Sequence, residues 1–120
     1  MSFNMPFGLF ITSSLKEGVT ADSYSEMGGR ASAMVAEKEP GTTVYNWWVG
    51  EDGTVIAQDG FADEAAFGVH MGNMTESGLL DEWMSLIDVK SVQVLGDVSV
   101  ATREALAPFG AVHYALEHKR

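Results

Sequence analysis

Thr42-Thr-Val-Tyr-Asn-Trp-Trp-Val49 and Thr54-Val-Ile-Ala-Gln-Asp-Gly-Phe61 flank the turn sequence Gly50-Glu-Asp-Gly53 near the middle of the chain. Both runs are rich in aromatic and β-branched residues, which favour strands, and an Asp-Gly pair favours a tight turn. The stretch therefore predicts a β-hairpin.

The segments around this hairpin complete an alternating pattern of strands and helices. Aromatic and β-branched residues predict a strand before the hairpin, and apolar residues at helical spacing, ended by Pro40 and Gly41, predict a helix between them. The predicted elements are a strand over 7–15, helices over 20–37, 63–71 and 77–86, a strand over 89–95, a helix over 100–107 and a strand over 111–116. This order predicts one α+β domain over residues 1–120: a ferredoxin-like βαββαβ unit with an antiparallel sheet and an appended helix and strand.

The first hairpin strand carries large apolar side chains on both of its faces. Side chains alternate across a strand, so Tyr45 and Trp47 point one way while Val44 and Trp48 point the other way. The helices of a small α+β domain cover one face of a sheet, which leaves the other face apolar and wet. We therefore expect a homodimer in which the sheets of two copies pack together.

The balance of charges argues against two classes of partner. The 120 residues include 17 acidic and 7 basic residues, for a formal net charge of -10. An acidic surface repels nucleic-acid phosphates and anionic lipid headgroups, so we expect neither nucleic-acid nor membrane partners. The chain shows no apolar run long enough to span a membrane and no signal-peptide pattern at its start, which predicts a cytoplasmic protein.

The residue types that bind metals and redox cofactors are scarce. The chain has no cysteine, which excludes disulfides, thiolate catalysis and iron–sulfur clusters. Its histidines, His70, His113 and His118, do not follow the spacing of a metal-binding helix. We therefore expect neither a metal site nor a cofactor.

Several motifs resemble the antibiotic biosynthesis monooxygenase superfamily, and in particular bacterial members without an assigned reaction. They are Glu39-Pro-Gly-Thr42 before an aromatic strand, Glu51-Asp-Gly53, Phe61-Ala-Asp-Glu-Ala-Ala-Phe67, and the closing stretch from Leu95 to Ala111. The resemblance covers most of the chain and implies a dimeric α/β barrel. It also implies activities as different as cofactor-independent oxygenation of polyphenols, quinol oxidation and haem breakdown.

The haem-degrading branch of that superfamily pairs a Trp with an axial His about ten residues later. This chain has His70 and Leu80 at those places, so the axial ligand is missing.

His70 is the predicted catalytic residue, because it resembles a histidine that faces the cleft between sheet and helices in this superfamily. A neutral imidazole there takes a proton from a phenol, and the resulting phenolate is electron-rich enough to react with O₂. The alternative is a histidine that only packs at the helix–sheet boundary.

Substrate-binding residues are expected on the hairpin, in one of two arrangements. Either Asn46 and Trp48 face the cleft, or Tyr45 and Trp47 do, because neighbouring side chains alternate. Asp59 is a further candidate, as a buried carboxylate that orients His70 or binds a cation. The alternative for the tryptophans is a place in the core or in a dimer interface.

The sequence therefore suggests a cofactor-independent monooxygenase that acts on a small aromatic phenol or quinol bound between sheet and helices. A dimeric ligand-binding, sensor or accessory module of the same fold, without catalysis, is the alternative.

Overall fold

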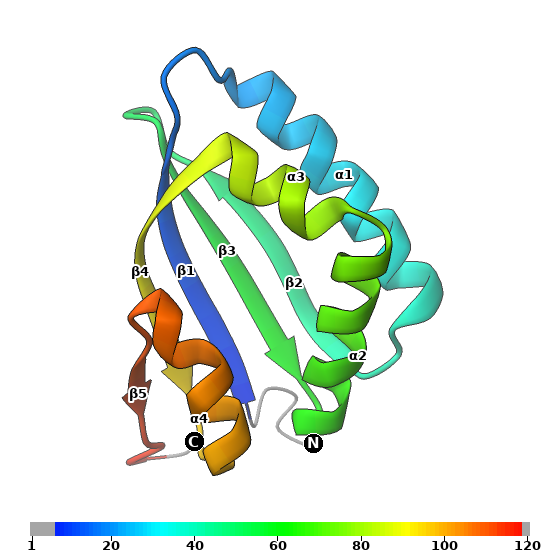
Figure 1. The fold of residues 1–120 in the computed structure, drawn as a ribbon, viewed down its shortest axis with the longest axis vertical. Coiled ribbons are helices and arrows are strands. Elements are labelled where there is room, and N and C mark those ends of the chain that lie inside the picture. The colour runs from blue at the N-terminus through cyan, green and yellow to red at the C-terminus, as the bar shows by residue number, and fades with distance from the viewer. Residues whose placement is uncertain (1–6, 119–120) are drawn as a thin grey trace.

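The computed structural model of the protein describes residues 7–118, which form a sheet and a layer of helices (Figure 1). The elements in chain order are β1 (Phe7–Leu15), α1 (Ala21–Lys38), β2 (Thr42–Val49), β3 (Thr54–Phe61), α2 (Glu64–Glu76), α3 (Leu79–Leu86), β4 (Ile87–Leu95), α4 (Val100–Leu106), a 3₁₀ turn (Ala107–Phe109) and β5 (Val112–Tyr114).

The strands form one sheet in the order β2-β3-β1-β4-β5. The first four strands are antiparallel neighbours, and β5 adds to β4 in parallel. The predicted ferredoxin-like βαββαβ unit with an appended helix and strand is confirmed. The hairpin prediction is confirmed as well, because β2 and β3 pair from Val49 and Val55 down to Thr42 and Phe61.

One helix boundary was predicted wrongly. The second helix was predicted to end at Met71, before Gly72 and Asn73, but α2 continues through both residues to Glu76. An interior glycine costs a helix only about 1 kcal/mol relative to alanine. Here the turn is held by tertiary contacts, because Asn73 donates a hydrogen bond to Glu39 at 3.1 Å and Met74 is buried in the core.

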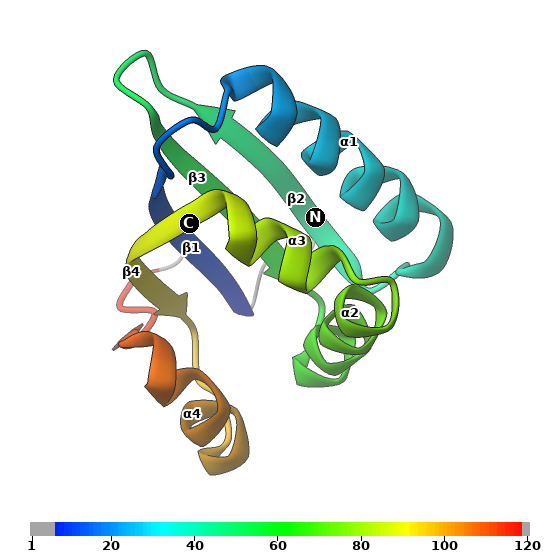
Figure 2. The same cartoon turned by 45° about the horizontal axis from the view of Figure 1, so that its top comes forward.

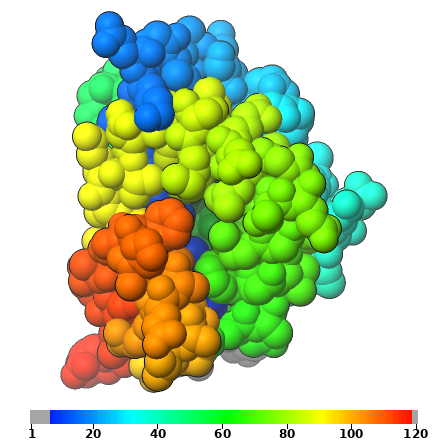
Figure 3. Space-filling view, in the orientation of Figure 1, coloured from blue at the N-terminus to red at the C-terminus, as the bar shows by residue number. Residues whose placement is uncertain are grey.

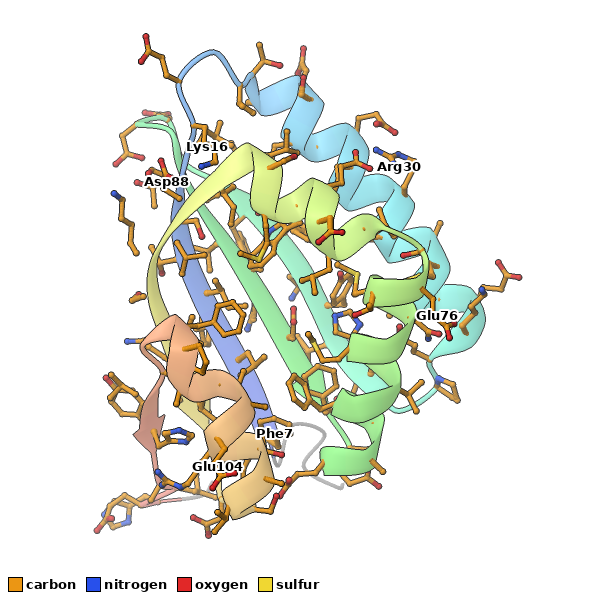
Figure 4. All side chains as sticks on the ribbon, in the orientation of Figure 1. Phe7, Lys16, Arg30, Glu76, Asp88 and Glu104 are labelled. Atoms are coloured by element: carbon orange, nitrogen blue, oxygen red, sulfur yellow. The ribbon has the colours of Figure 1, made fainter. Side chains whose placement is uncertain are left out.

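The helices lie on one side of the sheet (Figures 1 and 2). Two apolar clusters fill the space between the layers, one around Tyr24 and Met27 of α1 and one around Phe61 and Phe67. Phe7, labelled at the end of β1 in Figure 4, belongs to the second cluster. Within residues 7–118, no helix combines the length and apolar character needed to cross a membrane.

Gly28 in the middle of α1 lies against the ring of Trp47. A Cβ atom at this position would meet the indole at 3.3 Å, whereas a Cβ at the neighbouring Gly29 would meet nothing within 4 Å. The first glycine therefore lets α1 approach the sheet closely, and the second has no such reason.

No helix within residues 7–118 covers the opposite face of the sheet (Figures 1 and 2). It presents exposed apolar side chains, with Trp48 55%, Val112 53% and Tyr114 44% exposed. Such side chains are normally covered in a stable protein when they form a continuous patch. This bare sheet face is the one through which we expect two copies to pack.

The segment after β4 folds back over the helix side of the sheet. The Glu64 carboxylate at the start of α2 accepts hydrogen bonds from the Ser99 N–H at 2.7 Å, the Ser99 hydroxyl at 2.8 Å and the Thr102 hydroxyl at 2.6 Å. These contacts fasten α4 beside α2.

Candidate functional site

A cavity of about 70 Å³ lies between the sheet and the helices. In Figure 3 its surroundings are visible as a hollow between α4 and α2, with atoms of β1 at the bottom. A cavity of this size has room for more than one water molecule. Its wall is almost entirely apolar, and it includes Tyr45, Trp47, Asp59, His70, Trp83 and Phe109.

His70 is buried on α2, with only 4% of its surface exposed, and it lines this cavity. Its Nδ1 lies 2.8 Å from Oε1 of Glu39, whose side chain is itself 1% exposed. The Glu39 carboxyl also accepts hydrogen bonds from the Thr42 hydroxyl at 2.8 Å and the Asn73 amide at 3.1 Å. A carboxylate accepts hydrogen bonds, so Nδ1 carries the proton and the lone pair is on Nε2.

The protonation of His70 follows from these surroundings. Burial lowers the pKa of His70, while the charge of Glu39 and the hydrogen bond to it act in the opposite direction. The imidazole is therefore a neutral base at neutral pH whose ring is fixed by Glu39. Tyr45 and Phe61 hold the ring from two sides, with centroids 5.2 Å and 5.7 Å from it.

Asp59 on β3 is a second titratable group in the cavity wall. Its side chain is 8% exposed, and its Oδ2 lies 3.9 Å from Nε2 of His70, too far for a direct hydrogen bond. Burial, and secondarily the charge of Glu39, raises the pKa of Asp59 to about 7. The carboxyl therefore holds a proton for a large fraction of the time at neutral pH.

Tyr45 and Trp47 form the aromatic wall next to these groups. Their rings meet edge to face with centroids 5.4 Å apart, and Trp47 packs in the same way on Tyr24. Burial raises the pKa of Tyr45, as do the charges of Asp59 and Glu39. Tyr45 therefore stays a neutral phenol and does not compete with His70 as a base.

The structure brings four of the six predicted site residues together: Tyr45, Trp47, Asp59 and His70 all line the cavity. It does not bring Asn46 and Trp48 there. Both lie on the bare sheet face and donate hydrogen bonds to the Gln58 side chain, at 3.2 Å and 3.1 Å. Of the two arrangements that the sequence left open, the structure adopts the one with Tyr45 and Trp47 at the cleft.

The role of Glu39 was not predicted from the sequence, where this residue appears only in the motif that ends the first helix and leads into the aromatic strand. A signal for it existed: it follows the last turn of α1, where the helix dipole disfavours a negative charge. An acidic residue at such a place needs compensating partners, and here these are His70, Thr42 and Asn73. Trp83 of α3 and Phe109 of the 3₁₀ turn were also missed as wall residues.

The described part of the chain contains no group of three or more His, Asp or Glu side chains placed to hold a metal ion.

Comparison with known proteins gives matches of structure only. No protein-family model matches the sequence. A search of curated proteins found no match either.

The solved structures similar to this one define a class. The chain shares its fold with solved structures that are named antibiotic biosynthesis monooxygenases, and its buried His70 lines the cavity. One similar structure is that of MupZ from Pseudomonas fluorescens, with a TM-score of 0.81 and 16% identity over 95% of this chain and 92% of that one.

Two further structures carry the name of an activity. A Caulobacter crescentus protein, provisionally named an antibiotic biosynthesis monooxygenase, has a TM-score of 0.65 and 18% identity over 78% of this chain and 90% of its own. SnoaB from Streptomyces nogalater, a cofactor-independent oxygenase, has a TM-score of 0.63 and 10% identity over 78% of this chain and 94% of its own. At these identities the likeness is one of fold.

Proposed function

We propose that the protein is a cofactor-independent monooxygenase that binds a small aromatic phenol or quinol in the cavity. The observation that carries the proposal is the pair of His70 and Glu39: Nδ1 is held by a buried carboxylate at 2.8 Å, while the ring lines an apolar, aromatic cavity. The oxygenase name of a protein with this fold supports the choice of reaction class.

The chemistry starts with proton transfer. Nε2 of His70 takes the hydroxyl proton of the substrate, and the Glu39 carboxylate stabilises the imidazolium that forms. The phenolate gives electrons to O₂. One oxygen atom bonds to the ring carbon and the other leaves as water, so that a phenol and O₂ become a quinone and water. The electrons come from the substrate itself.

The wall of the cavity suits a flat ring. Tyr45, Trp47 and Trp83 offer aromatic surface, and within residues 7–118 the cavity lining contains neither lysine nor arginine. Neutral aromatic rings are bound by such surfaces through apolar burial and edge-to-face contacts. An organic acid would find no positive partner there.

Oxygen consumption with a panel of phenols and quinols tests the proposal. We expect uptake by the wild type, a loss of about 10²- to 10⁴-fold in His70→Gln, and a smaller loss in Glu39→Gln, which leaves the base but removes the charge behind it. Asn46→Ala on the bare sheet face is the matched control and should keep full activity.

The same experiment distinguishes the oxygenase from a ligand-binding or sensor module without catalysis. A phenol that raises the unfolding temperature of both wild type and His70→Gln, with no oxygen uptake by either, would support that module and contradict the oxygenase.

We also propose that the protein is a homodimer through its bare sheet face. Trp48 is 55% exposed on this face; it pairs with the partly exposed Ile56 on β3, and the partly exposed Phe10 lies on β1, the next strand of the sheet. Burying such side chains against a second copy stabilises a dimer by about 25 cal/mol per Å² of apolar area. Light scattering should give twice the 12.9 kDa of one chain. A monomer at micromolar concentration would contradict the proposal.

A further inference from the structure

Asp59 is a titratable residue of the cavity wall that has no role in the reaction proposed above. Asp59 lines the cavity, and its polar neighbours do not donate hydrogen bonds to its carboxyl: Nε2 of His70 is 3.9 Å away, and the Tyr45 hydroxyl points to the Met74 sulfur. A buried ionised carboxylate without partners is costly, whereas a protonated carboxyl is a hydrogen-bond donor at little cost. The protonation state of Asp59 therefore decides whether the cavity favours a neutral or a positively charged ligand.

The position of Asp59 relative to His70 suggests a shared ligand atom. The 3.9 Å between Oδ2 and Nε2 is too long for a direct hydrogen bond. An oxygen atom about 2.8 Å from each of them fits this spacing. Such an oxygen can give its proton to Nε2 and accept one from the carboxyl of Asp59.

The charged and titratable groups around Asp59 agree with this reading. Glu39 and His70 face it from the α1–β2 turn and from α2, and Tyr45 and Tyr24 face it from β2 and α1. None of them carries a positive charge when His70 is neutral. The surroundings therefore favour a proton on Asp59.

We propose that Asp59, as a protonated carboxyl, donates a hydrogen bond to the same substrate oxygen from which His70 removes the proton. This inference rests on the proposed function and assigns a further residue to its site. The ligand is a neutral hydroxyl compound, such as a phenol, that becomes an oxyanion in the site. Asp59 stabilises that oxyanion, as a neutral donor placed where negative charge develops.

The opposite reading is an ionised Asp59 that binds an organic cation among the aromatic rings. Carboxylates and aromatic surfaces both attract ammonium groups. The two readings differ in the charge of the preferred ligand, which can be measured directly.

Absorption of bound 4-nitrophenol tests the inference, because its phenolate absorbs visible light and the neutral phenol does not. At pH 6 we expect the wild type to bind it with a raised phenolate fraction, and His70→Gln to lose that rise. Asp59→Leu should lower the ionisation constant of the bound phenol by about 10- to 100-fold, which is the effect of one hydrogen bond to a charged group. Asp59→Asn should keep the ionisation, because its amide still donates.

Asp59→Asn also serves if Asp59→Leu fails to fold. At pH 9, above the pKa of about 7, wild-type Asp59 is ionised and repels the phenolate, so the Asn variant should bind 4-nitrophenolate more tightly than the wild type.

Each other outcome overturns a stated part of the proposal. Unchanged or increased ionisation in Asp59→Leu, with the dependence on His70 intact, would overturn the role of Asp59 alone. If benzylammonium binds more tightly than the phenol, and this preference is lost in Asp59→Asn, then Asp59 binds a cation and its proposed role as a donor is overturned. Ionisation that does not depend on His70, or no binding of the phenol at all, would overturn the proposed function and this inference together.

Discussion

Replacing Asp59 by Asn should make the protein more stable at alkaline pH. Burial raises the pKa of Asp59 from 3.8 to about 7, so between these values the folded state binds a proton that the unfolded state has released. Stability therefore falls as pH rises through this window. Each pKa unit corresponds to about 1.36 kcal/mol, which gives an upper limit of about 4 kcal/mol for the loss. The Asn variant, which has nothing to ionise, avoids it.

Urea unfolding of both proteins between pH 4 and pH 9 measures this effect. The difference in unfolding free energy should grow in favour of Asp59→Asn as pH rises and level off above about pH 8. The lowered pKa of His70 acts in the opposite direction, because stability is lost as pH falls below 6.5, but it acts in both proteins. Asp97→Asn, at an exposed position, is the matched control and should show no such trend. A difference that stays flat across the range would refute the account of a buried, proton-holding Asp59.

Three further predictions concern the packing that holds the site. Gly41→Ala should destabilise the protein by about 1–3 kcal/mol, because its Cβ would lie 2.6 Å from that of Ala66. Gly29→Ala, in open space on α1, should stabilise the protein by about 0.4–1 kcal/mol. Thermal unfolding of each variant measures the change in stability. Asp63→Ala should cost about 1 kcal/mol in urea unfolding, because it removes the side-chain oxygen that accepts the Ala66 N–H at 2.8 Å and caps α2; an unchanged midpoint would contradict that role. Trp48→Thr should weaken a dimer, seen as a smaller particle on dilution in light scattering, while oxygen uptake of the remaining dimer stays the same.

The architecture could be predicted from the sequence because its signals are local. The Asp-Gly turn between two aromatic strands and the helical spacing before Pro40 and Gly41 each act over a few residues. The end of α2 could not be predicted in this way. It is fixed by Asn73 and Met74, whose partners come from other parts of the chain.

The residue types of the candidate site could be predicted from the sequence, but the contacts between these residues could not. Alternation along β2 limited the cleft residues to two sets, and only the packing of α1 on Trp47 selects between them. Glu39 and His70 are 31 residues apart, and no sequence spacing links them. Their contact depends on how the α1–β2 turn meets α2, which is a property of the whole fold.

Under the proposed function, the segment from Ser99 to Phe109 shapes the cavity without taking part in the proton transfer. Leu106 and Phe109 belong to the cavity wall, yet they come from a stretch of chain that contributes no acid or base to the site and is fastened to α2 through Glu64. We therefore expect a substitution at Leu106 or Phe109 to change the shape of the cavity and to leave His70 and Glu39 in place. Exchanging about a dozen residues of this segment would adapt the cavity to molecules of different size while His70 and Glu39 stay the same. Loops diversify the enzymes of other folds in the same way.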